Sequence, residues 1–179
     1  LHGAGHVGRA IVHLLAGLPC GVDWVDEREA EFPASTQLPP HIQVVATDEP
    51  VAEVAHAPPG SFFLVLTHSH ELDLRITDAI LRRRDFAYCG LIGSATKRAR
   101  FMHRYEQRGV PEEALARLTC PIGLPGLAGK EPEVIAVSVV AQMLAVAGIQ
   151  GSRPTTDLLA QSLPDAQAPK TSSGLASAA

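Results

Sequence analysis

Three glycines near the start of the chain have the spacing of a dinucleotide-binding turn. Gly3 to Gly8 reads Gly-Ala-Gly-His-Val-Gly, the pattern G-x-G-x-x-G. Such glycines allow a tight bend, a close approach of backbone to a phosphate, and close packing of helix on strand. Asp26 ends the next apolar segment, where an acid could accept hydrogen bonds from ribose hydroxyls. The alternative is that the glycines serve packing only and that Asp26 is a solvated acid.

Two histidines follow the apolar run 62–67 with one residue between them. If the strand continues, His68 and His70 point to the same side, and Asp73 lies within one turn of them. Imidazoles in such an arrangement bind a metal or donate hydrogen bonds to a ligand. The spacing matches no strong metal signature, so we predict contacts with a polar ligand and no metal site. A structural role at the end of a strand is the alternative.

A third polar group follows the apolar run 86–92. Gly93 and Ser94 precede Lys97 and Arg98 at the expected start of a helix. Backbone amides, a hydroxyl and two cations then converge, which suits a phosphate or a carboxylate. The alternative is a serine that caps the helix, beside cations that face solvent.

The elements that position these groups alternate between strand and helix. Only Leu1 and His2 precede the glycine turn, so we expect the first strand to be truncated. Further strands are predicted at 22–25, 42–46, 62–67 and 86–92, and helices at 71–84, 94–107, 111–118 and 131–147. This alternation predicts an α/β Rossmann-like fold with a doubly wound parallel sheet, strand order 3-2-1-4-5 and three layers. The three polar groups then share the carboxyl edge of the sheet, where ligands bind.

Composition excludes several other classes of protein. The net charge is −4 and no basic block is present, which argues against nucleic-acid binding. No apolar run approaches the roughly 20 residues that span a bilayer, and no secretory signal is evident. The three cysteines lie far apart, so a reducing cytoplasm is expected. No Ser/His/Asp order or carboxylate pair suggests a hydrolase, and we predict no catalytic residue.

Taken together, these motifs resemble one known family over residues 1–147. The motifs that carry the resemblance are Gly3–Gly8, Trp24–Arg28, Thr67–Asp73, Gly90–Arg98, Pro121–Leu124 and Gly129–Pro132. They resemble the C-terminal, Rossmann-like domain of the XdhC/CoxI family, the xanthine dehydrogenase accessory proteins. We expect this domain at 1–150 and a disordered tail at 151–179, while the family's N-terminal domain is not part of the sequence.

The resemblance implies a cytoplasmic maturation factor rather than an enzyme. Such a protein binds molybdenum cofactor (molybdopterin), protects it during sulfuration by a cysteine desulfurase, and delivers it to xanthine dehydrogenase. The cofactor-binding residues expected here are Gly3, Gly5, His6, Val7, Gly8, Asp26, Arg28, His68, His70, Asp73, Gly93, Ser94, Lys97 and Lys130. One alternative is an NAD(P)-dependent oxidoreductase or nucleotide-binding regulatory domain. Another is a structural domain that forms a homodimer.

Overall fold

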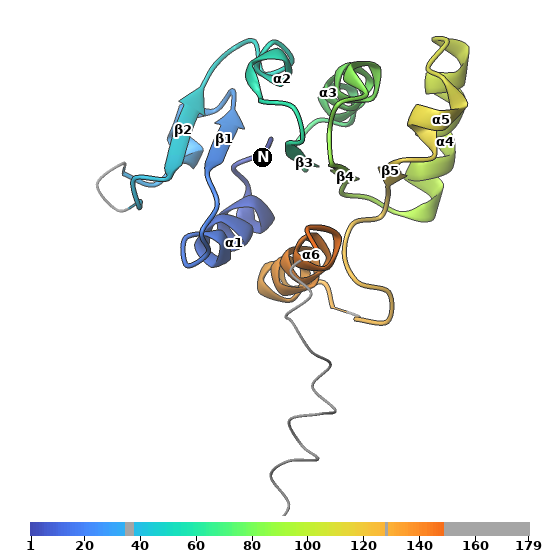
Figure 1. Cartoon of the computed structure of the whole chain (residues 1–179). Coiled ribbons are helices and arrows are strands. Elements are labelled where there is room, and N and C mark those ends of the chain that lie inside the picture. The colour runs from blue at the N-terminus through green and yellow to red at the C-terminus, as the bar shows by residue number, and fades with distance from the viewer. Residues whose placement is uncertain (35–37, 128, 149–179) are drawn as a thin grey trace, which may run out of the picture. The chain divides into compact units, whose positions relative to one another are not determined.

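Parallel strands with helices on both sides make up the part of the chain that the structure describes. This computed structural model describes residues 1–34, 38–127 and 129–148. The strands are β1 (Val22–Asp26), β2 (Ile42–Ala46), β3 (Phe62–Val65), β4 (Tyr88–Leu91) and β5 (Leu118–Thr119). The α-helices are α1 (His6–Leu15), α2 (Glu53–His56), α3 (His70–Arg83), α4 (Ala95–Gln107), α5 (Glu112–Leu115) and α6 (Pro132–Val146). Figure 1 shows α1 and α6 on one side of the strands and α2 and α3 on the other.

The strands form two parallel ladders that meet at His2. β1 pairs with β2, while β3, β4 and β5 pair in that order, and every pairing is parallel. His2 makes isolated parallel bridges to both Val25 and Val65. The architecture is therefore α/β and Rossmann-like, with a two-stranded and a three-stranded sheet. A continuous order 3-2-1-4-5 stays a prediction, because only His2 stands where the first strand would run.

Two differences from the expected elements concern short segments. The predicted helix over 111–118 is the single turn α5, and Leu118 begins β5 instead. His70 begins α3 instead of extending a strand, because the Ser69 side chain accepts a hydrogen bond from the Leu72 amide and caps the helix. The tail predicted at 151–179 lies outside the described residues.

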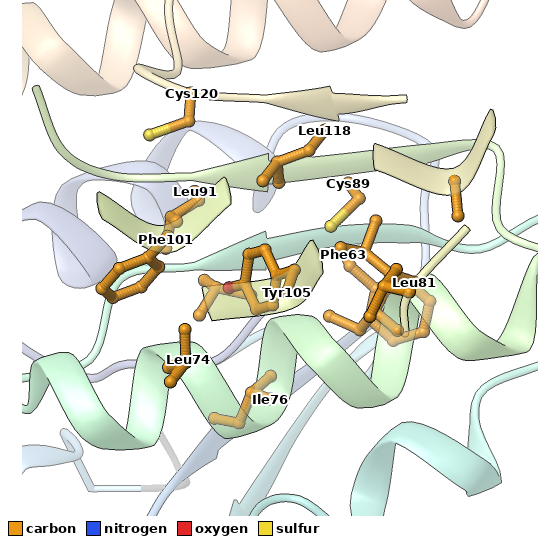
Figure 2. Packing of buried hydrophobic residues seen from close by; sticks show 14 of the residues in the cluster. Phe63, Leu74, Ile76, Leu81, Cys89, Leu91, Phe101, Tyr105, Leu118 and Cys120 are labelled. Atoms are coloured by element: carbon orange, nitrogen blue, oxygen red, sulfur yellow. The ribbon is translucent and has the colours of Figure 1, made fainter. Parts of the chain in front are cut away.

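One hydrophobic cluster lies between α3, α4 and the strands. Leu74, Ile76 and Leu81 of α3 are fully buried in the same cluster as Phe63 of β3 (Figure 2). Leu74 and Leu81 are seven residues apart, which places them on one face of α3. This packing fixes the start of α3 next to the end of β3.

A second cluster joins α1 and α6 to β1. Ile11 and Val12 of α1 and Val139 of α6 are buried, as is Trp24 of β1. The Trp24 indole also donates a hydrogen bond to the Gly3 carbonyl at 3.0 Å, so the core holds the glycine turn directly. The most apolar helix, α6, has 15 residues. None of the helices in the described ranges is long and apolar enough to cross a membrane.

Candidate functional site

The glycine turn contains two glycines that the backbone requires and one that faces open space. Gly3 has a φ of +126°, and a Cβ there would lie 2.3 Å from the Leu66 carbonyl oxygen. A Cβ on Gly8 would lie 2.1 Å from the Gly3 carbonyl oxygen. A Cβ on Gly5 would meet nothing within 4 Å. Gly3 and Gly8 thus allow the turn to close, whereas the space beside Gly5 is open to a ligand.

The amides that follow Gly5 begin α1 without a side-chain cap. Gly5 occupies the N-cap position, and the first turn of α1 contains no acidic residue. His6 is exposed, while Val7 is half-buried and packs against the second cluster. By contrast, the first turn of α3 contains two acids of its own. The positive end of the α1 dipole is therefore available to an external anion.

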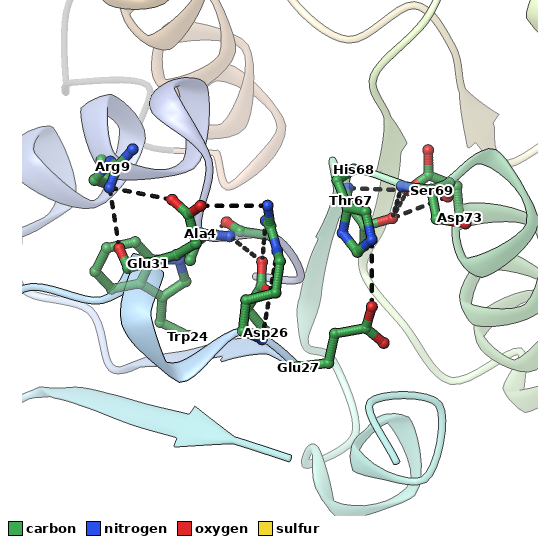
Figure 3. A network of polar contacts seen from close by, with 12 residues as sticks. Ala4, Arg9, Trp24, Asp26, Glu27, Glu31, Thr67, His68, Ser69 and Asp73 are labelled. Carbon is green, nitrogen blue, oxygen red and sulfur yellow. Dashed lines mark hydrogen bonds and ion pairs between the residues drawn. The ribbon is translucent and has the colours of Figure 1, made fainter. Parts of the chain in front are cut away.

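Asp26 lies at the end of β1 and its carboxylate is almost fully covered. It accepts hydrogen bonds from the Ala4 amide at 2.6 Å and from the Arg28 amide, Nε and Nη2 at 2.9 Å each (Figure 3). Burial alone would raise the pKa of Asp26, but the hydrogen bonds from Arg28 and Ala4 hold it below its ordinary value. Asp26 is thus neither a solvated acid nor a free acceptor, because Arg28 covers it.

His68 and His70 do not form the pair that a continued strand predicts. Both side chains are exposed, and each contacts a different element. His68 Nε2 lies 3.3 Å from Glu27 Oε1, which links the ends of β3 and β1 (Figure 3). His70 Nδ1 lies 3.1 Å from the Arg100 guanidinium of α4. The structure corrects the expected common direction, since β3 ends at Val65 and α3 begins at His70.

Asp73 and Lys97 form a buried ion pair instead of presenting two groups to a ligand. The Lys97 ammonium lies 2.6 Å from Asp73 Oδ2 and also donates to the Ile92 carbonyl at 2.8 Å. The other Asp73 oxygen accepts from the amide and hydroxyl of Thr67. The side chains of Asp73 and Lys97 are 1% and 9% exposed. This pair therefore connects the segment after β3, through Thr67, to the segment after β4, through Ile92.

The start of α4 keeps the predicted capping geometry. The Ser94 hydroxyl accepts a hydrogen bond from the Lys97 amide at 3.2 Å. Gly93 and Ser94 are exposed, and the first turn of α4 contains no acid. A Cβ on Gly93 would lie 2.7 Å from the Lys97 side chain, so glycine makes room for the buried lysine stem. Helix starts of this kind favour anions, and ligand binding at this one stays a prediction.

Two polar residues of α6 anchor the loop after β5, and neither was among the predicted site residues. Gln142 accepts from the Gly123 amide and donates to the Gly123 carbonyl, both at 2.9 Å, and its oxygen also accepts from the Tyr88 hydroxyl at 2.6 Å. The Ser138 hydroxyl accepts from the Leu124 amide at 2.7 Å. A glutamine and a buried serine in an otherwise apolar helix are the signal that could have identified them.

A groove of about 340 Å³ lies between α1 and α6 beside the glycine turn. His6, Arg9 and His13 line it from α1, with Pro132 and Glu133 from the start of α6. Its volume is within the range of small-molecule sites. Lys130 is exposed and lies two residues before α6 begins. Its contact with a ligand stays a prediction.

The remaining groups that could do chemistry are the potential metal ligands and the cysteine thiols. Within the described ranges no group of three or more His, Cys, Asp or Glu side chains could hold a metal ion. The three cysteines are free thiols. Burial raises the pKa of Cys89 to about 12 and also raises that of Cys120. Both thiols therefore stay protonated near neutral pH.

Comparisons with known proteins show which family this chain resembles. YqeB of Escherichia coli K12, an uncharacterized protein, is 33% identical over 151 residues, which are 82% of this chain and 26% of YqeB. A crystal structure from Bacillus halodurans, described as a xanthine dehydrogenase, aligns with a TM-score of 0.65 and 25% identity. The alignment covers 88% of this chain and 45% of the Bacillus chain.

The chain thus spans about a quarter of the first relative and less than half of the second. A family model described as the XdhC Rossmann domain matches residues 1–143. This match includes the glycine turn, both strand ends beside it and the start of α4. The chain therefore belongs to the XdhC family and contains its Rossmann domain.

Proposed function

We propose that this chain binds molybdenum cofactor and takes part in the maturation of xanthine dehydrogenase. Family membership supports the connection with xanthine dehydrogenase, and the Bacillus structure with the same fold bears that enzyme's name. The observation that carries the binding role is the open space beside Gly5 at the uncapped start of α1. A phosphate group in that space would accept hydrogen bonds from the amides that follow Gly5.

The residues around this space fit a phosphorylated pterin. The starts of α1 and α4 both lack acids in their first turns, so each could receive an anionic group of the cofactor. The Ser94 hydroxyl and the exposed imidazoles of His68 and His70 add polar groups for the pterin or the oxo and sulfido groups. When bound, the cofactor would supply the molybdenum centre that the target enzyme uses in its redox chemistry. The role of this chain is to bind, orient and shield it.

Three further parts of the proposal concern the setting in which the protein acts. Xanthine dehydrogenase would receive the cofactor, and a cysteine desulfurase would supply the sulfur while the cofactor is bound. We place these steps in the cytoplasm, where three free thiols are expected to remain reduced. A homodimer would bring two such crevices together. Binding of the cofactor is the step that this domain can be tested for directly.

The test is a calorimetric titration of the 179-residue chain with molybdenum cofactor, followed by thermal unfolding with and without it. A ligand at about 100 times its dissociation constant stabilises the fold by about 2.7 kcal/mol. We expect saturable binding and a matching rise in the unfolding temperature. Ser94→Ala should weaken binding, because it removes a hydroxyl at the second anion position. No binding by the wild-type chain at concentrations that saturate a full-length family member would contradict the proposal.

A further inference from the structure

Asp26 has the position of a ribose-binding acid but does not have the free oxygens of one. A ribose diol donates two hydroxyl hydrogens to such a carboxylate. Here the Asp26 side chain is 2% exposed. Both of its oxygens already accept hydrogen bonds from Arg28, and one also accepts from the Ala4 amide. A diol would have to displace the guanidinium before it could bind.

The guanidinium is held in place from more than one direction. Arg28 Nε and Nη2 each lie 2.9 Å from Asp26, a two-point contact with fixed geometry. Arg28 Nη1 lies 3.5 Å from Glu31, and Glu31 in turn lies 3.3 Å from Arg9. This chain of contacts holds the Arg28 guanidinium against the Asp26 carboxylate.

We propose that Arg28 is a specificity-determining residue that withholds the Asp26 carboxylate from ribose diols. The crevice then discriminates against NAD-type dinucleotides, while the open amides beside Gly5 still accept a phosphate. The inference rests on the proposed function in one respect, namely that this crevice binds a ligand. It adds the chemical class that the crevice rejects and the residue that causes the rejection.

The test measures NAD binding to the wild-type chain, Arg28→Ala and Arg82→Ala. Removing the Arg28 side chain exposes both Asp26 oxygens, so Arg28→Ala should gain affinity for NAD by about 10- to 100-fold, the effect of one or two new hydrogen bonds to a charged acceptor. Arg82→Ala is the matched control, because Arg82 also contacts an aspartate through Nε and Nη2, namely Asp78, but makes no described contact with Asp26. It should leave NAD affinity unchanged.

Two further variants show whether the gain depends on the carboxylate. The double variant Asp26→Asn with Arg28→Ala should lose the gained affinity, because an amide accepts less strongly from a diol than a carboxylate does. Arg28→Lys keeps a cation beside Asp26 but replaces a two-point contact with a single donor, so it should give a smaller gain. Arg28→Lys also tests the role of Arg28 if thermal unfolding shows that Arg28→Ala does not fold.

The outcomes separate this inference from the proposed function. Tight NAD binding by the wild-type chain, or no gain in the folded Arg28 variants, would overturn the role of Arg28. Molybdenum cofactor is titrated in parallel into the same proteins. If the wild-type chain fails to bind the cofactor while Arg28→Ala gains NAD affinity, the proposed function is wrong and the specificity role of Arg28 stands.

Discussion

At the scale of single residues, Asp26 acts as the connection between two segments of the site. Its carboxylate accepts from Ala4 inside the glycine turn and from Arg28 after β1. Charged acceptors make hydrogen bonds about twice as strong as neutral ones. The acid therefore holds the glycine turn against the end of β1, in addition to any role toward a ligand.

The lowered pKa of Asp26 predicts how stability depends on pH. A carboxyl whose pKa is lower in the folded than in the unfolded protein adds stability at pH values above its ordinary pKa of about 4. This stability is lost as the pH falls through the pKa of the folded protein. Asp26→Asn should cost about 1–3 kcal/mol of unfolding free energy at pH 6. The difference from wild type should shrink below pH 4.

Urea unfolding at several pH values measures this difference. Asp48→Asn is the matched control, because Asp48 follows β2 with an exposed side chain, and it should change stability little at any pH. A cost of Asp26→Asn that stays constant from pH 6 to pH 3 would show that the charge of Asp26 has no such role.

At the scale of elements, the buried ion pair between Asp73 and Lys97 joins α3 to α4. It also holds Thr67 and Ile92, which end the segments that follow β3 and β4. Removing one member of a buried pair leaves an uncompensated charge, which costs about 3–5 kcal/mol. Lys97→Met should therefore lower the free energy of unfolding by this amount.

Two comparisons make the Lys97 prediction specific. Replacing both partners, with Asp73→Asn and Lys97→Met together, should cost less than Lys97→Met alone, because no buried charge remains. Arg104→Met should cost no more than about 1 kcal/mol, since Arg104 and Glu71 are 40% and 57% exposed. Equal losses for Lys97→Met and Arg104→Met in urea unfolding would refute the structural role of the buried pair.

At the scale of the whole molecule, the sequence predicts the elements better than it predicts their contacts. The helical spacing of Leu72, Ile76 and Ile80 identifies α3, and Ser94 marks the start of α4. These signals are local, because propensity and capping act within one turn. The strand β5 has two residues and is too short to show such a pattern, and it forms by pairing with β4.

The sequence did not predict how the candidate site residues pair with one another. Asp73 and Lys97 are 24 residues apart, and nothing in their local sequence shows that each neutralises the other. Asp26 and Arg28 were both predicted site residues, but their spacing alone did not show that one covers the other. The glycine turn was more predictable, because Gly3 and Gly8 are required by the backbone itself.

The most direct test of the central claim compares molybdenum cofactor binding by the wild-type chain and Gly5→Ala. Gly5 has a φ of −67°, and a Cβ there meets nothing within 4 Å, so the variant should fold with a loss of less than about 1 kcal/mol. Its methyl group would occupy the space proposed for the phosphate. We predict at least about tenfold weaker binding, equivalent to about 1.4 kcal/mol, with nearly unchanged unfolding. Equal cofactor affinity for Gly5→Ala and wild type would contradict the claim that the ligand lies on the glycine turn.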